Sequence, residues 1–265
     1  MRYLTKRNRA ILREMVSTDF KLRYQGSAVG YAWSLLRPLF LFAILDVVFV
    51  KAFPLGKGIE HYQVYLFVGI VLWNFFYEMT VQSVGAIVGR GDLIRKISIP
   101  RWIVIFSTSL AALINVALNL IVVGIFMIIA HVHIDAHALL IFPILLEVYA
   151  LGLGASLLLS AVFVKFRDVG YIWEVVLQAG FYLTPILYPI SKIHSEFFQK
   201  LLFMNPLAQA IQDARYALVT RTQPTVQSVF HGGWYALIPF VIVAGVCVLG
   251  VSYFKKQSKY FAENI

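Results

Sequence analysis

Long apolar runs separated by short polar segments dominate the chain. The clearest run extends from Trp102 to Ala130 and contains no ionisable side chain. At ~1.5 Å per residue, a helix of this length exceeds the ~30 Å hydrocarbon core of a bilayer, so it is expected to tilt or protrude. Five further runs have a similar character. The expected spans are about 35–53, 62–88, 102–130, 139–164, 171–188 and 234–254.

Composition supports the same class. Of the 265 residues, 60% are hydrophobic and 14% are charged, whereas a soluble domain carries roughly 25% charged residues. The chain has too few charged side chains to cover a water-facing surface, and a bilayer is the solvent that fits. The predicted fold class is therefore an all-α integral membrane protein with six transmembrane helices.

The net charge of +10 lies beside the apolar runs, so it indicates a membrane topology and no nucleic-acid partner. Most Lys and Arg residues fall in four segments that six spans place on one side: 1–37, 89–101, 164–169 and 255–259. The positive-inside rule then puts both termini in the cytoplasm, in a multi-pass protein of the cytoplasmic (inner) membrane. The first residues show no signal peptide.

The segment before the first span is amphipathic. Its apolar positions recur at spacings of three, four and seven: Leu4, Ile11, Leu12, Met15, Val16 and Phe20. This pattern predicts an interfacial helix, which acts either as a basic topology anchor or as a lever moved by a cytoplasmic partner. The expected organisation is an N-terminal segment over 1–33, a transmembrane domain over 34–257 and a cytoplasmic tail over 258–265.

Two prolines interrupt the chain between the fifth and sixth spans. Pro185 and Pro189 end a helix, an apolar stripe follows over 193–202, and a second helical stretch is expected from Leu207 to Val219. Two helices too short to cross predict an outer re-entrant hairpin. The hairpin either lies at the headgroups or forms a lid over an exit path.

Several candidate chemistries remain open or are absent. Four acids fall within expected spans: Asp46, Glu78, Glu147 and Glu174. They suit either proton coupling or hydrogen bonding between helices. The outer histidines 131, 133 and 137 suit a polar loop better than a metal site. No G-x-x-x-x-G-K-[ST] motif occurs, so we expect no nucleotide site and no catalytic residue in this chain.

The loop at 89–101 is charged but carries apolar residues at 93, 94, 97 and 99. A short helix with one apolar face would dock into a partner's groove, while a solvated connector fits the pattern equally well. A second cytoplasmic turn covers 164–169.

Four sequence blocks resemble the type 2 ABC exporter permeases, closest to the O-antigen, teichoic acid and related polysaccharide exporters. The first is LRYQGSAVGYAWSLLRPL at 22–39, and the others lie at 93–101, at 166–169, and at 181–189 followed by Asn205-Pro206-Leu207. The blocks occur in order along nearly the whole chain.

That resemblance implies a homodimer paired with two copies of a separate ABC ATPase, which binds ATP and Mg, while this chain binds no cofactor directly. The cargo would be a polysaccharide linked to a polyprenyl diphosphate. The chain would also contact membrane lipids. The residues expected to couple to the ATPase are Gly91, Asp92, Leu93, Ile94, Arg95, Lys96, Ile97, Lys165, Arg167 and Asp168. Those considered for a substrate path are Tyr62, Trp73, Phe76, Tyr77, Glu78, Phe181, Tyr182 and Arg23, although aromatic belts and helix packing also use such side chains.

Two other functions remain as alternatives. An ion-coupled secondary transporter would require Glu78 or Asp46 and no ATPase. A membrane enzyme of glycolipid metabolism would require a catalytic cluster at one membrane face. The sequence leaves open which polysaccharide is carried and whether the host is Gram-negative or Gram-positive.

Overall fold

The computed structural model describes residues 6–24, 30–52, 56, 58–92 and 99–261, and every regular element in these ranges is helical. Four helices among them are long and apolar enough to cross a membrane. They are α3 (Tyr62–Val84), α6 (Trp102–Ile129), α7 (Ile141–Lys165) and α12 (Ile238–Gln257). Short helices η3 (Ala136–Leu140) and η5 (Trp234–Leu237) precede the last two. The all-α membrane class is confirmed.

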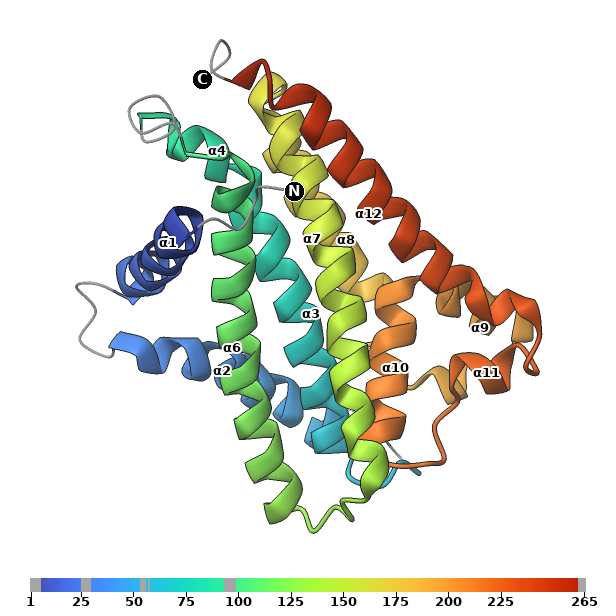
Figure 1. Cartoon of the computed structure of the whole chain (residues 1–265). Coiled ribbons are helices and arrows are strands. Elements are labelled where there is room, and N and C mark those ends of the chain that lie inside the picture. The colour runs from blue at the N-terminus through green and yellow to red at the C-terminus, as the bar shows by residue number, and fades with distance from the viewer. Residues whose placement is uncertain (1–5, 25–29, 53–55, 57, 93–98, 262–265) are drawn as a thin grey trace.

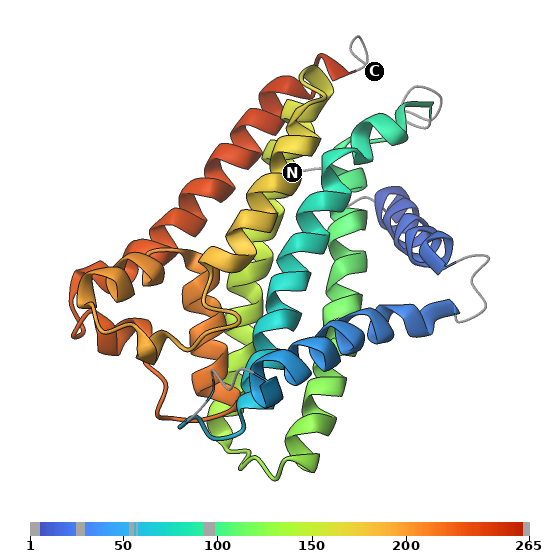
Figure 2. The same ribbon diagram turned by 180° about the vertical axis from the view of Figure 1, so that it is seen from behind.

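Helix α3 lies at the centre of the bundle, with α6 and α7 packed against it (Figures 1 and 2). Every residue from Val64 to Trp73 is buried, including polar-tipped Tyr65. A helix that is apolar all round must be covered on all sides. The surrounding helices supply that cover, so α3 forms the axis of the main hydrophobic core.

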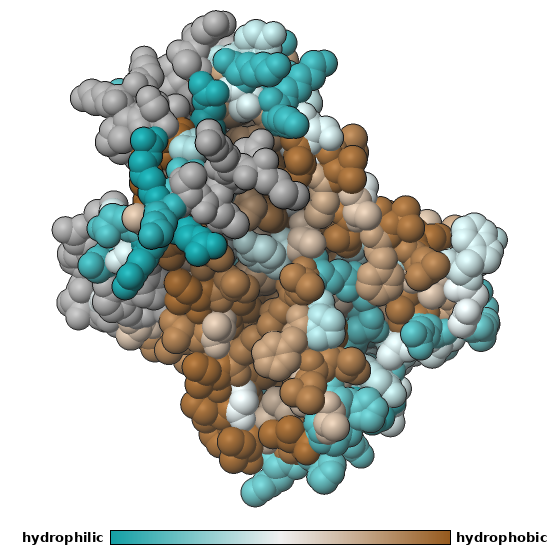
Figure 3. All heavy atoms as spheres, in the orientation of Figure 1, coloured by the Kyte–Doolittle hydropathy of each residue, from teal (hydrophilic) through white to brown (hydrophobic). Residues whose placement is uncertain are grey.

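The outer helices keep apolar side chains on their surfaces. Exposed examples include Ile121 and Ile128 on α6, Leu146 on α7, and Val248 on α12. Figure 3 shows brown apolar atoms across the middle of one face and teal polar atoms toward both ends. Such a belt is too large for a water-facing monomer and fits contact with hydrocarbon.

The expected first and fifth spans correspond to shorter apolar helices. Helix α2 (Trp33–Asp46) continues into the π-helix η2 (Val47–Ala52) and runs across the long helices instead of alongside them (Figures 1 and 2). Helix α8 (Val169–Leu183) ends short of the predicted residue 188, with Thr184 extended before Pro185. Proline disfavours a helical conformation at the residue before it, which explains the early end.

Short helices fill the segment between α8 and α12: η4 (Ile190–Lys192), α9 (Glu196–Phe203), α10 (Pro206–Leu218) and α11 (Val226–Val229). Asn205 caps α10 by accepting a hydrogen bond from the Leu207 amide at 3.0 Å, and Pro206 suits the first helical turn. The prediction of two short helices is correct for α9 and α10, while α11 was not expected. Helix α10 packs against α3 and α7, but α9 exposes Phe197 and Phe198.

Helices α7 and α12 pack against each other at close range. At the contact, a Cβ atom on Gly250 would lie 2.1 Å from the carbonyl oxygen of Gly154. Small residues allow membrane helices to approach at backbone distance. This glycine pair therefore seats α12 on the bundle.

Candidate coupling site

The N-terminal helix α1 (Lys6–Tyr24) packs along α6. Leu12 and Val16 face Leu110 and Leu113 across a shallow cleft of about 400 Å³, so the expected amphipathic helix is present and its apolar side meets the bundle. Met15 reaches a second hydrophobic cluster formed by the ends of α4 (Ala86–Gly89), α6, α7 and α12. We call this end of the molecule the α4 end.

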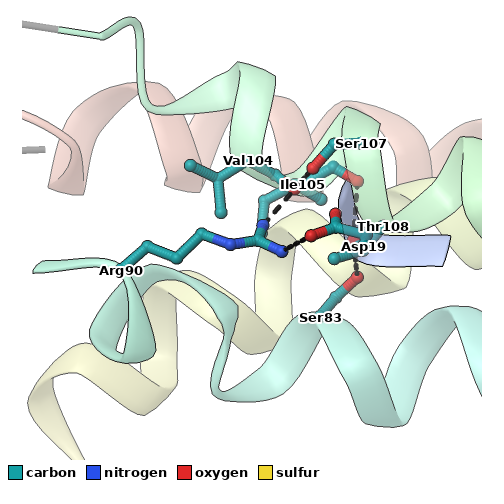
Figure 4. A network of polar contacts seen from close by, with 7 residues as sticks. All are labelled: Asp19, Ser83, Arg90, Val104, Ile105, Ser107 and Thr108. Atoms are coloured by element: carbon teal, nitrogen blue, oxygen red, sulfur yellow. Dashed lines mark hydrogen bonds and ion pairs between the residues drawn. The ribbon is translucent and has the colours of Figure 1, made fainter. Parts of the chain in front are cut away.

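A polar junction ties α1 to this end (Figure 4). Arg90, directly after α4, donates a hydrogen bond to Asp19 of α1 and forms an ion pair with it. Its other terminal nitrogen donates to the Ser107 hydroxyl of α6 at 3.3 Å. The two charged side chains are 25% and 15% exposed, so solvent screens this pair less than a surface ion pair.

The helices beneath Arg90 are held by hydroxyl groups. Ser83 of α3 lies 3.1 Å from Thr108 of α6, oxygen to oxygen, and Ser107 and Thr108 each donate to a backbone carbonyl one turn back. Ile87 of α4 is fully buried in the cluster below. Arg90 therefore extends from a fixed base toward α1, immediately before the loop predicted to couple to an ATPase.

The predicted coupling residues are only partly described. Gly91 is buried and Asp92 is exposed, while Leu93, Ile94, Arg95, Lys96 and Ile97 lie outside the described residues. In the second predicted segment, Lys165, Arg167 and Asp168 are all exposed. The preceding Val164 packs in the same cluster as Ile87. The structure thus brings Gly91, Asp92 and the 165–168 turn to the α4 end.

The residues considered for a substrate path separate into different environments. Trp73 packs edge-to-face on Phe181, with ring centroids 5.8 Å apart, and Phe76 packs likewise on Trp173 at 6.4 Å. These contacts form an aromatic seam between α3 and α8. Tyr62 lies at the other end of α3 from Val84 and donates its hydroxyl to the Leu187 carbonyl.

The other residues considered for a substrate path have different surroundings. Tyr182 is 64% exposed, Tyr77 packs half-buried against the core, and the side chain of Arg23 lies outside the described part of α1. Glu78 accepts hydrogen bonds from Asn115 of α6 at 2.8 and 3.0 Å and from Gln82 at 3.1 Å. Its contact with Asn115 favours the interpretation of helix-to-helix hydrogen bonding over proton coupling.

Another ion pair, between Arg221 and Asp135, lies at the opposite end of α6 from the Arg90 junction. Asp135 accepts a hydrogen bond from Arg221 and another from the His137 amide, and these contacts hold the pKa of its carboxyl below the usual range. The His137 ring lies 3.3 Å from the same carboxylate. This arrangement links the α6–η3 loop to the segment after α10 and gives His137 a carboxylate partner.

Sequence reasoning missed Asp19 and Arg215. Asp19 stands 71 residues before Arg90, and no local pattern pairs them. Arg215 is fully buried, although it lies in a short helix that was predicted only from its place after Pro206. A charged residue within a segment that also contains Ala208, Ala210, Ala214 and Ala217 was the available signal, because small residues indicate close packing.

Comparison with protein families decides the class of the chain. Residues 12–219 match the profile of the ABC-2 type transporter family. The chain belongs to this family. The matched part of this ABC-2 type transporter chain begins inside α1 and ends just after α10, so it includes the Arg90 junction, the 165–168 turn and Arg215.

Curated relatives extend the match over nearly the whole chain. An O-antigen export system permease protein RfbA of Myxococcus xanthus is 26% identical over 97% of this ABC-2 type chain and 96% of its own length. Two proteins of the same name from Klebsiella pneumoniae are each 26% identical, over 94% of this chain and 92% of their lengths. The expected resemblance to polysaccharide exporter permeases is confirmed.

Proposed function

We propose that this chain is the permease subunit of an ATP-driven exporter that moves an O-antigen-type polysaccharide, linked to polyprenyl diphosphate, across the cytoplasmic membrane. The observation that carries the proposal is the match to O-antigen export permeases over both chains' lengths. A bundle of long apolar helices with a polar junction beside the expected coupling loop supports it. ATP and Mg belong to a separate ATPase, because the sequence lacks a phosphate-binding loop.

The function is tested by deleting the gene and restoring it on a plasmid. Deletion should remove long-chain polysaccharide from the cell surface and leave lipid-linked polymer inside, because a polar polymer cannot cross the hydrocarbon core unaided. Surface labelling with polymer-specific antibody and extraction of the internal lipid-linked pool measure the two effects. Normal surface polysaccharide in the deletion strain would overturn the proposal. Export that persists without ATPase and stops with a protonophore would favour the secondary-transporter alternative.

The proposed topology has six spans, with α2–η2 and α8 completing the four long helices, and with an outer hairpin of α9 and α10. Lys255 and Lys256 in the last turn of α12, with Lys259 just after it, support a cytoplasmic tail over 258–265. The transmembrane domain would cover 34–257, after the N-terminal segment 1–33.

A reporter fused after Lys259 should report cytoplasm, and one inserted beside His133 should report the opposite side. The reason is the Lys and Arg bias toward the α4 end. Paired phosphatase and fluorescent-protein fusions give the measurement. A reporter fused before residue 6 is the control, because it should report the same side as the tail. Both test positions on one side would contradict the topology.

The active unit is proposed to be a homodimer with two ATPase subunits. Helix α8 supports this, because its outward face is strongly apolar and uncovered in a single chain. The exposed residues are Tyr171, Ile172, Val175, Val176, Tyr182 and Leu183. A second copy or lipid must cover such a face. Tyr182 and the neighbouring Phe181 would then lie near the boundary between copies, where a substrate path could run.

The coupling contact is proposed to lie at the α4 end. Leu93, Ile94 and Ile97 would dock on the ATPase, with charged neighbours at the rim and with Lys165, Arg167 and Asp168 as a second contact. The buried position of Gly91 and the exposure of the 165–168 turn support this placement. The Arg90–Asp19 pair would then join the docking loop to α1.

A further inference from the structure

Three consecutive backbone carbonyls after α8 are held by side chains from other helices. The two terminal nitrogens of Arg215 donate to the Pro185 carbonyl at 2.6 Å and to the Ile186 carbonyl at 2.7 Å. The Tyr62 hydroxyl donates to the next carbonyl, that of Leu187, at 2.5 Å. Helices α10 and α3 therefore grip the turn where α8 ends.

Arg215 is itself fixed from several sides. Its Nε donates to the Tyr65 carbonyl at 3.0 Å, one terminal nitrogen also donates to Gln212 Oε1 at 2.7 Å, and the guanidinium lies 3.6 Å from the centre of the Tyr65 ring. The side chain has no exposed surface. A Cβ on Gly69 would lie 2.5 Å from a terminal nitrogen of Arg215, so the glycine leaves the space that the guanidinium occupies.

Burying the Arg215 guanidinium among these contacts has a high free-energy cost. The described acceptors of Arg215 are carbonyl and amide oxygens, and burying a cation without a carboxylate is costly. An apolar side chain would fill the same volume at lower cost. The planar fork of arginine, however, holds several acceptors in fixed directions at once. The geometry indicates a positioning role for Arg215 rather than simple packing.

The remainder of α8 is held less tightly than its end. Leu177 is buried, but most of the helix surface is exposed or half-buried, and its inner side rests on the aromatic seam with α3. Its other end follows the exposed 165–168 turn. Helix α8 thus has one end pinned to the core and one end at the proposed ATPase contact.

We propose that Arg215 is the positioning residue that pins the outer end of α8, so that a push on the 165–168 turn makes α8 pivot about residues 184–187. This proposal rests on the proposed export function for its consequence. The pin itself is a property of the folded chain. Without it, α8 would slide or tilt without a fixed point, and hydrolysis would move the helix without opening a path.

The test weakens the pin in two mild ways. Tyr62→Phe removes the hydroxyl that holds Leu187, and Gly69→Ala places a methyl group against the Arg215 guanidinium. Tyr149→Phe is the control for Tyr62→Phe, because it also removes a tyrosine hydroxyl from a contact with another segment of the chain. The Tyr149 hydroxyl lies 3.1 Å from the Ser109 hydroxyl of α6. Gly124→Ala is the control for Gly69→Ala, because a Cβ there meets open space. The more severe Arg215→Met and the charge-conserving Arg215→Lys complete the set.

Hydrogen exchange on the purified chain, followed by mass spectrometry, reads the pin directly. Amides of 184–190 should exchange about tenfold faster in Tyr62→Phe and Gly69→Ala, with α7 and α12 unchanged, because local opening then lacks one restraint. In the complex with its ATPase, ATP hydrolysis should stay within about twofold of wild type, while polysaccharide exported per ATP falls about tenfold. Arg215→Lys should retain more export per ATP than Arg215→Met.

Each other outcome is decisive. Unchanged exchange at 184–190 in both mild variants overturns the pin, whatever the cargo is. Faster exchange across α3, α7 and α12 together shows general loss of stability and also overturns it. Local opening with normal export per ATP overturns the pivot. A wild-type complex that exports no polysaccharide would contradict the proposed function, while the exchange result still decides the pin.

Discussion

Replacing Gly250 by valine should prevent α12 from seating on α7 and should abolish the folded membrane domain. The added Cβ would lie 2.1 Å from the Gly154 carbonyl oxygen, and the opposing Cβ of a residue at 154 would meet the Cys247 backbone at 2.9 Å. Backbone on both sides cannot rotate away as a side chain can. Overpacking in a core typically costs about 1–3 kcal/mol, and a clash with backbone belongs at or beyond the upper end.

The measurement is the yield of monodisperse protein in mild detergent and its midpoint of thermal unfolding. Gly245→Val is the matched control, since it makes the same change on the same helix where a Cβ would meet nothing within 4 Å. The control should behave as wild type within about 0.5 kcal/mol. Equal yields and equal midpoints for the two variants would mean that α12 does not cross α7 at this glycine pair.

Helices with an uninterrupted apolar run could be predicted nearly to the residue. The run 102–130 became α6 (Trp102–Ile129), because burial in lipid leaves a backbone few alternatives to a helix. The C-terminal end of α8 was predicted five residues too late, at 188 instead of Leu183. Apolar residues continue to Leu187, but Pro185 stops the helix at Leu183, so hydrophobicity and backbone chemistry give different ends there.

Other features depend on the tertiary arrangement. The direction of α2 across the bundle could not be predicted. Its apolar run fits a helix parallel to the other spans equally well. Gly154 and Gly250 meet only because α7 and α12 cross where they do. The aromatics chosen for a substrate path were selected by residue type, and burial then places Trp73 and Phe76 in a packing seam while Tyr182 stays exposed.

The Arg90 junction shows the same limit for the functional site. Contact with a partner was one of two interpretations of the sequence for both the loop after residue 89 and the N-terminal helix, but the sequence did not connect them. The connection is a single ion pair between residues far apart in the chain. Its position between two proposed moving parts makes it the strongest place to test coupling.

Charge reversal at Arg90 should uncouple ATP hydrolysis from export. Arg90→Glu would place a carboxylate beside Asp19, removing a charge-assisted hydrogen bond and adding like-charge repulsion at a partly buried site. Losing such a bond costs about 2 kcal/mol, or roughly a thirtyfold shift away from docked α1. The ATPase should still co-purify through Leu93 and Ile94, so hydrolysis should continue while export per ATP falls at least about tenfold. A Leu93→Ala, Ile94→Ala variant should differ by losing the ATPase itself.

The double variant Asp19→Arg, Arg90→Glu restores opposite charges at the junction and should recover most of the lost export. A single Lys200→Glu change is the control, because it reverses an exposed ion pair with Glu196 on α9, and such pairs contribute about 0.5 kcal/mol or less. Co-purification, ATP hydrolysis and surface polysaccharide are measured on the same strains. Recovery by the swap, with no effect of the control, would establish that the ion pair carries the coupling. Normal export per ATP in Arg90→Glu alone would show that α1 and the loop act independently, leaving the 165–168 turn as the remaining route from the ATPase to the spans.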